Sequence, residues 1–299
     1  MLHGKAAAAL IASQPLYLCR ARHYAQAMNY RHAFHAGSFS DCMKHALLVW
    51  LIDALQRKPA PIFVLDTHAG AGRYDLTAGP ARRTGEWRQG IERLIDVPPS
   101  ALGRYLGFIR TLGLYPGSPA LIRAMLRPED RLACCELQSD DLFELRRHFA
   151  RDPQVSVHQR DAWEALGALL PPKERRGLVL IDPPFENAEE FSNLAAGLAA
   201  AHVRFRAGVL VAWYPIKHRA PVRGFHTAMQ QTGIRDIVAA ELSLREPLMP
   251  DRLNGCGLLV VNPPFKFEQE ALPILQALLE RLGRNERGAC ATVTRIANE

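Results

Sequence analysis

The sequence has no apolar run long enough to cross a membrane and no cysteine pattern typical of a metal site or a disulfide framework. Its longest apolar stretches, Ala6 to Ala12 and Ala46 to Ile52, fall far short of the roughly 18 to 20 residues that a membrane-spanning helix needs. The six cysteines form no Cys-x-x-Cys pair and have no histidines at zinc spacing; they stand at positions 19, 42, 134, 135, 256 and 290. We therefore expect a cytoplasmic protein with reduced thiols, no membrane contact and no metal.

Lysine is scarce. Only 6 of the 37 basic residues are lysines, and arginine supplies the remaining 31. The formal net charge of +7 is compatible with a polyanionic partner, because cations that neutralise phosphates give affinity that does not depend on base sequence. A genome rich in arginine codons produces the same excess, so charge alone leaves a nucleic-acid partner open.

Acidic residues are missing from positions 1–27, which are rich in alanine. This composition is also seen in transit peptides. A chemically denser segment begins at Met28, so we expect 1–27 to be a disordered or spurious extension and 28–299 to form the functional domain.

Seven short apolar runs alternate with segments of helix length. They are Ile62 to Asp66, Leu132 to Glu136, Val155 to His158, Leu178 to Asp182, Val209 to Trp213, Ile237 to Leu242 and Leu258 to Asn262. Because each run is apolar throughout rather than alternating, the pattern predicts an α/β fold with a seven-stranded, mostly parallel sheet covered on both faces. Such sheets bind ligands at the carboxyl ends of their strands.

Two helical regions accompany this sheet. A helix capped by Ser40, with Asp41 in its first turn, is predicted to run up to the prolines at 59 and 61. About 60 residues separate the first two strands, far more than a simple crossover needs. We expect an inserted helical subdomain at about 74–130.

The segment from Asp66 to Gly72 directly follows the first predicted strand. Its small residues let the backbone turn tightly and approach a nucleotide-like ligand, with Gly70 and Gly72 as the turning points. As a dinucleotide fingerprint it fails, because Asp75 stands where the third glycine belongs. As the first loop of a methyltransferase it fits better, and a tight turn that binds no ligand stays an alternative.

Two further acids follow strands. Glu136 ends the second predicted strand, where a carboxylate accepts two hydrogen bonds from a ribose diol. Asp161 lies just beyond the third, where it would meet the exocyclic amine of an adenine ring; a helix N-cap is the competing explanation and the better one on this residue alone.

The sharpest motif is Asp182-Pro183-Pro184-Phe185, after the fourth predicted strand. The lone pair of an exocyclic amine is delocalised into its ring, so methylation needs acceptors that favour a pyramidal nitrogen. The Asp182 carboxylate and the Pro183 carbonyl are such acceptors, and the prolines hold the turn rigid. Phe185 offers a face on which a base stacks, worth about 1 to 3 kcal/mol. A rigid turn without chemistry remains the alternative.

A second turn, Asn262-Pro263-Pro264-Phe265, has nearly the same sequence. It comes late in the chain, after the last predicted strand, whereas Asp182 follows the glycine loop, Glu136 and Asp161 in order. We therefore assign the chemistry to Asp182 and a structural turn to Asn262.

The segment from Asn29 to Gly37, which leads to Lys44, mixes basic and aromatic residues. Tyr30 would stack on bases while Arg31 and Lys44 meet phosphates. A solvated loop before a helix is the alternative.

Taken together, these residues resemble the bacterial RlmJ family, the 23S ribosomal RNA adenine-N6 methyltransferases, from about Met28 to the C-terminal end. The most specific pieces are Tyr30 to Gly37, Leu65 to Tyr74, Tyr115 to Pro119, Ile181 to Glu186 and Trp213 to Pro215. The resemblance implies a Rossmann-like class I methyltransferase with a helical insertion after the first strand, S-adenosyl-L-methionine as methyl donor, 23S ribosomal RNA as partner, and a monomer.

The resemblance also implies site residues. By the resemblance, Asp182 would be catalytic, Tyr30 would meet the RNA with Lys44 as a further member of the site, and the donor would be bound by His45, His68, Ser118, Glu136, Asp161 and the loop at Ala162. The residue patterns described above add Pro183 and Phe185 beside Asp182, Arg31 on the RNA side, and Asp66, Gly70 and Gly72 at the donor. No metal is implied.

The sequence departs from the family in three places. Phe185 replaces the usual tyrosine, Ala162 the usual glycine, and the lead of 27 residues has no counterpart. Related folds that methylate amines share the motif at Asp182, so a DNA adenine or protein glutamine methyltransferase is a second hypothesis. A non-catalytic RNA-binding protein that kept the fold is a third.

Overall fold

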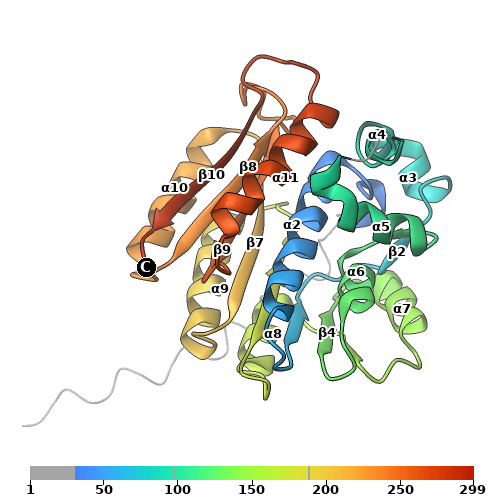
Figure 1. The fold of residues 1–299 in the computed structure, drawn as a ribbon, viewed down its shortest axis with the longest axis vertical. Coiled ribbons are helices and arrows are strands. Elements are labelled where there is room, and N and C mark those ends of the chain that lie inside the picture. The colour runs from blue at the N-terminus through green and yellow to red at the C-terminus, as the bar shows by residue number, and fades with distance from the viewer. Residues whose placement is uncertain (1–30, 97–98, 188) are drawn as a thin grey trace, which may run out of the picture. The chain divides into compact units, whose positions relative to one another are not determined.

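An eight-stranded mixed sheet forms the centre of the computed structural model, which describes residues 31–96, 99–187 and 189–299 (Figure 1). The strand order is β10-β8-β9-β7-β6-β1-β4-β5. The strands are β1 (Phe63–Asp66), β4 (Arg131–Cys135), β5 (Val155–His158), β6 (Gly177–Ile181), β7 (Val209–Ile216), β8 (Ile237–Ser243), β9 (Gly255–Val261) and β10 (Cys290–Ala297). The expected extension over 1–27 and Tyr30 lie outside the described residues.

All seven predicted strands are present within a few residues of their expected bounds, and the mostly parallel sheet is confirmed. Strands β5, β4, β1, β6 and β7 pair in parallel, and β9 and β10 run antiparallel to their neighbours. The predicted count of seven was wrong, because β10 was missed. This strand lies at the edge of the sheet, is only partly buried, and alternates threonine and arginine with apolar residues, so it forms no apolar run.

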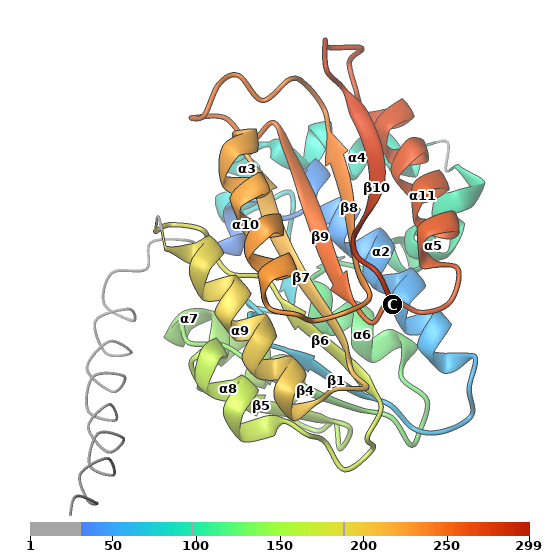
Figure 2. The same ribbon diagram turned by 90° about the vertical axis from the view of Figure 1, so that its left-hand side faces the viewer.

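Helices cover both faces of the sheet (Figures 1 and 2). They are α2 (Phe39–Gln56), α3 (Gly79–Thr84), α4 (Glu92–Ile95), α5 (Gly103–Thr111), α6 (Ser118–Met125), α7 (Ser139–His148), α8 (Ala162–Leu169), α9 (Glu190–Arg204), α10 (Arg219–Gln231) and α11 (Phe267–Leu282). One apolar cluster packs α2, α5, α6 and α11 on one face, and another packs α8, α9 and α10 on the opposite face. Alternate residues of the central strands enter the two clusters, as a sheet buried on both faces requires.

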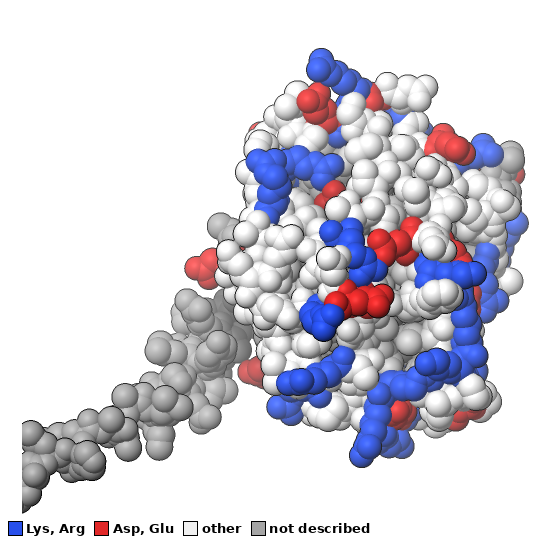
Figure 3. All heavy atoms as spheres, turned by 60° about the vertical axis from the view of Figure 1, so that its left-hand side comes forward, with Lys and Arg blue, Asp and Glu red and all other residues white. Residues whose placement is uncertain are grey.

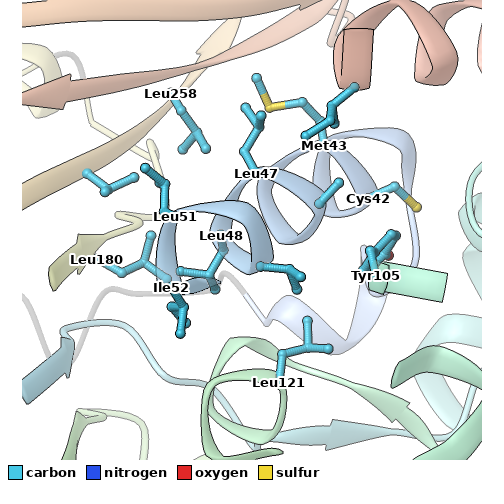
Figure 4. Packing of buried hydrophobic residues seen from close by; sticks show 14 of the residues in the cluster. Cys42, Met43, Leu47, Leu48, Leu51, Ile52, Tyr105, Leu121, Leu180 and Leu258 are labelled. Carbon is cyan, nitrogen blue, oxygen red and sulfur yellow. The ribbon is translucent and has the colours of Figure 1, made fainter. Parts of the chain in front are cut away.

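Helix α2 is almost entirely buried (Figure 4). Its leucines at 47, 48 and 51 are 0% exposed and pack in the cluster that contains Leu180 of β6 and Leu258 of β9. The expected cap at Ser40 was wrong: the helix begins at Phe39, and the Ser38 hydroxyl accepts from the backbone N–H of Asp41. This helix end is therefore held deep in the protein, beside the carboxyl ends of the strands.

The stretch between β1 and β4 contains α3, α4, α5 and α6, together with the short strands β2 (Arg73–Tyr74) and β3 (Tyr115–Pro116). Its 3-10 turns are η2 (Glu86–Gln89) and η3 (Ser100–Leu102), and η1 (His32–Phe34) precedes α2. The whole stretch belongs to one compact unit, Arg31–Glu299. Its description as an inserted subdomain stays a prediction. No helix among the described residues is both long enough and apolar enough to cross a membrane.

The two similar proline turns lie at opposite ends of the strands. Strand β6 runs parallel to β7, so Asp182 lies at the end where the parallel strands finish. Strand β9 runs the other way, and Val261 pairs with Leu210 near the start of β7. Asn262 instead closes a turn, donating from Nδ2 to the carbonyls of Arg206 at 2.7 Å and Gly208 at 2.9 Å.

Candidate active site

Three acidic residues come together where the central strands end. Asp66 pairs in register with Cys134 of β4 on one side and with Leu180 of β6 on the other. Glu136 and Asp182 each lie two residues beyond these partners, so the three acids occupy one edge of adjacent strands. This is the edge at which open parallel sheets bind ligands.

The glycine loop after β1 has the backbone shape that the sequence predicts. Gly70 and Gly72 have φ values of 59° and 81°, which few residues other than glycine adopt. A Cβ added to Gly70 would lie 2.3 Å from the Tyr74 hydroxyl. The Gly70 N–H donates to Oε2 of Glu136 at 2.8 Å, and the Gln138 N–H donates to Oε1 at 2.7 Å. Glu136 is thereby fixed by the loop it faces.

Asp66 is fully buried and is held from two sides. The Ser118 hydroxyl, in the first residue of α6, donates to Oδ2 at 2.7 Å, and the His68 N–H lies 3.3 Å from Oδ1. The structure thus joins Asp66, His68 and Ser118, three of the predicted donor contacts.

Asp161 caps the N-terminus of α8, which was the alternative explanation for this residue. Its Oδ1 accepts from the N–H groups of Trp163 at 2.9 Å and Glu164 at 3.2 Å. Among the described residues no hydrogen bond is made to its Oδ2. Ala162 is buried at the first position of α8. Capping uses one oxygen and leaves the other for a ligand.

Asp182 is held by two predicted site residues. Its backbone N–H donates to Nδ1 of His68 at 3.2 Å, which places the proton of that neutral ring on Nε2. Nζ of Lys44 donates to Oδ2 of Asp182 at 2.6 Å. Lys44 reaches Asp182 from α2, which is 138 positions away in the sequence and carries no signal of this contact.

Phe185 lies in a small aromatic cluster. Its φ of 51° is left-handed, an uncommon conformation for a residue with a bulky side chain. The ring packs edge-on against Phe191, with centroids 4.9 Å apart, and against Trp213 at 5.9 Å. Pro183, in the same turn, is buried. The strained backbone and the edge contacts together fix the direction of the Phe185 ring.

The start of α2 and the segment before it complete the site. His45 is fully buried, and its Nδ1 lies 3.2 Å from the Tyr115 hydroxyl. Arg31 is exposed and forms an ion pair with Asp140, outside the acidic edge. Asp41, which was not among the predicted site residues, is 2% exposed and lies within 3.5 Å of Lys44 and His45. Its spacing of three and four residues from these two on one helix was the available signal.

Burial dominates the titration of the site. It raises the pKa of Asp66 to about 6 and that of Glu136 to about 7, against the hydrogen bonds that both carboxylates accept. It also lowers the pKa of His45 to about 3 and that of His68 to about 4. Both histidines are therefore neutral at pH 7. The site offers acceptors and neutral imidazoles, and the described residues contain no group of side chains suited to hold a metal ion.

Residues 59–295 match a family model described as Ribosomal RNA large subunit methyltransferase D, RlmJ. The chain is 38% identical over 263 residues to Ribosomal RNA large subunit methyltransferase J of Escherichia coli (strain K12), covering 85% of this chain and 94% of that protein. It is 36% identical over 264 residues to the protein of the same name from Haemophilus influenzae, with the same coverage. A solved structure of a Legionella pneumophila protein is also similar, with a TM-score of 0.79, 32% identity, and coverage of 87% of this chain and 98% of that one.

Proposed function

The chain belongs to the RlmJ family of ribosomal RNA large subunit methyltransferases, and we propose that it transfers a methyl group from S-adenosylmethionine to N6 of an adenine in 23S ribosomal RNA. We choose an amine as the methyl acceptor because the Asp182-Pro183-Pro184-Phe185 turn lies at the end of β6, beside the acids at the ends of β1 and β4. The described cysteines are free thiols, in keeping with our further proposal that the protein is cytoplasmic. We also propose that it is a monomer.

The residues at the carboxyl ends of β1, β4 and β5 include the hydrogen-bond acceptors that a nucleoside such as S-adenosylmethionine needs. Within the described residues each carboxylate oxygen of Glu136 accepts one backbone N–H, so each keeps a lone pair for a ribose hydroxyl. The free Oδ2 of Asp161 suits an adenine amine, and Asp66 with Ser118 offers polar contacts near the glycine loop. When bound, S-adenosylmethionine supplies an electrophilic methyl group on a sulfonium.

On the acceptor side, Asp182 and the Pro183 carbonyl take hydrogen bonds from the two N6 hydrogens. This pairing localises the nitrogen lone pair and directs it away from both acceptors. Asp182 needs a fixed position to do this, which the His68 contact and the Lys44 ion pair support. Positioning of this kind accounts for most of the acceleration that we expect, without a covalent intermediate.

The target base would leave its stack to reach this turn, at the cost of unstacking. The Phe185 face offers a stacking contact in return, and its edge contacts with Phe191 and Trp213 keep it oriented. We propose that Arg31, Lys44 and Tyr30 contribute on the RNA side, although Tyr30 lies outside the described residues. On the face drawn in Figure 3, Lys and Arg lie in several groups with acidic residues among them, so charge marks no single RNA path on that face.

Labelled S-adenosylmethionine tests the proposal when offered with transcribed 23S ribosomal RNA, duplex DNA or a peptide-release factor. We expect label only in RNA, as N6-methyladenine, and an Asp182→Ala rate lower by about 100-fold or more. Asp251→Asn, in the exposed loop after β8, is the matched control and should keep the wild-type rate. Label in DNA or protein, or normal turnover by Asp182→Ala with the donor bound, would contradict the proposal.

A further inference from the structure

Asp41 is a buried carboxylate on which several nitrogen atoms converge. Its Oδ1 lies 3.1 Å from Nζ of Lys44, 3.3 Å from Nε2 of His32 and 3.4 Å from Nε2 of His45. Its Oδ2 accepts from the backbone N–H of Gly37 at 3.0 Å. The residue is 2% exposed, so these contacts are shielded from solvent. A carboxylate in such a place needs a specific reason to be there, because burying a charge is costly.

Lys44 stands between two carboxylates. Its ammonium donates to Oδ2 of Asp182 at 2.6 Å and lies 3.1 Å from Oδ1 of Asp41. Lys44 therefore makes its short hydrogen bond to Asp182 while a second acceptor of the same charge lies within reach.

Asp182 has two partners. In the proposed reaction its carboxylate accepts a hydrogen bond from the amino group of the target base, and in this structure Lys44 donates to Oδ2 at 2.6 Å, so a carboxylate that turns toward the base weakens its bond to Lys44. Lys44 is 4% exposed, so its ammonium cannot turn to water when the base arrives. An ammonium left in the protein interior without a carboxylate would be strongly unfavourable.

We propose that Asp41 is a positioning residue that receives the Lys44 ammonium when Asp182 turns an oxygen to the amino group of the target base. The inference rests on the proposed function. One hydrogen bond of Lys44 moves from Asp182 to Asp41, the amine takes the oxygen released, and no proton changes hands. Asp41 thus acts through Lys44 and needs no contact with the base.

Other charged and titratable groups also face Lys44. They are His45 of α2, Asp66 and His68 at the end of β1, and Cys256 of β9, while His32 of η1 faces Asp41. Burial acts to raise the pKa of Asp41, but His45, His32 and Lys44 together bring it well below its usual range. Asp41 is therefore ionised at neutral pH, which is the state that an alternative counter-ion requires.

The Asp41→Asn variant tests the inference in single-turnover methylation of an RNA transcript, with Asp53→Asn as the matched control. Asp53 lies on the same helix, 30% exposed, and pairs with Arg104 at 2.8 Å outside the site. We expect Asp41→Asn to lower the rate by about 10-fold or more and Asp53→Asn to leave it within about twofold. The alkaline limb of the pH profile should move to lower pH only in Asp41→Asn, because Lys44 loses an anionic neighbour.

A double-mutant cycle separates an action through Lys44 from general damage. In a Lys44→Met background, adding Asp41→Asn should cost less than about twofold, whereas an equal cost in both backgrounds overturns the inference. Thermal unfolding and calorimetry with S-adenosylmethionine identify variants that fail to fold or to bind the donor.

A measurement on Lys44 itself needs no activity. The chain has six lysines, so ¹⁵N-lysine NMR can follow the Lys44 side chain, assigned by its loss in Lys44→Met. Its titration midpoint should fall in Asp41→Asn and not in Asp53→Asn. An unchanged midpoint overturns the inference even if the wild type methylates RNA. Failure of the wild type to methylate any RNA rejects the proposed function instead.

Discussion

The buried carboxylate of Glu136 makes donor binding depend on pH in a way that can be calculated. Burial raises its pKa from 4.5 to about 7, although both oxygens accept backbone N–H groups. In the proposed complex the same oxygens accept the hydroxyls of a ribose, a role that favours the ionised form. Binding should therefore release a proton, and affinity should rise as the pH passes through 7.

The size of the effect follows from the pKa. With a value of about 7, roughly a tenth of the Glu136 side chains are ionised at pH 6 and roughly nine tenths at pH 8. The dissociation constant for S-adenosylmethionine should thus fall by about 10-fold over this interval. Asp66, with a pKa of about 6, adds only about a factor of two, because it is already half ionised at pH 6.

Calorimetry on wild type and Glu136→Gln, at pH 6 and pH 8, tests this prediction. The variant should bind more weakly at pH 8 and keep only the pH dependence due to Asp66 and to the amino group of the ligand. The difference between the two proteins isolates Glu136. Titrations in buffers of different ionisation enthalpy should show that the wild type releases up to one proton more than Glu136→Gln at pH 6. Equal pH dependence in both proteins would refute the reasoning.

The unliganded protein should show the opposite trend. A carboxylate whose pKa is raised on folding stabilises the protein below its unfolded pKa of about 4.5, and that stabilisation is lost as the pH rises through 7. Between pH 6 and pH 8 the free energy of unfolding of the wild type should fall by about 1 kcal/mol more than that of Glu136→Gln. Urea unfolding at the two pH values measures it.

Two further predictions concern the proline turn and the glycine loop. Phe185→Ala should weaken RNA binding by about 1 to 3 kcal/mol, seen as a higher KM. Phe265 is 82% exposed at the opposite end of the strands, so Phe265→Ala should leave KM unchanged. Equal effects of the two substitutions on KM would remove the reason for preferring Phe185. Gly70→Ala should destabilise the protein by about 1 to 3 kcal/mol in urea unfolding, because of its φ of 59° and the Tyr74 hydroxyl 2.3 Å from the added Cβ. Gly107→Ala, in the middle of α5 with open space around the added Cβ, should instead raise the free energy of unfolding by about 0.5 to 1 kcal/mol. A lower free energy of unfolding for this variant would contradict the assignment of Gly107 to a helix.

Local sequence was sufficient to predict most of the sheet. Strands buried on both faces must be apolar throughout, so β1, β4, β5, β6, β7, β8 and β9 appear as short apolar runs separated by helices. The residues that end parallel strands meet at one edge, so the order of Asp66, Glu136 and Asp182 along the chain predicted their proximity. The same order separated Asp182 from Asn262, which the antiparallel direction of β9 places on the other edge.

Contacts between distant segments could not be predicted in this way. The pairing of β10 with β8 depends on a partner strand about fifty positions earlier, because an edge strand needs no apolar run of its own. The cap of α2 was misplaced by two residues for a local reason: Ser38, and not the predicted Ser40, accepts from the backbone N–H of Asp41.

The sequence by itself determined the class of fold, the family and the residue types at the strand ends, because hydrophobic periodicity and short motifs are local properties. Only the tertiary structure decided that Lys44, on a buried helix, lies 2.6 Å from Asp182 and 3.1 Å from Asp41. Charge contacts of this kind arise from how α2 packs against the sheet, and packing depends on the whole chain at once.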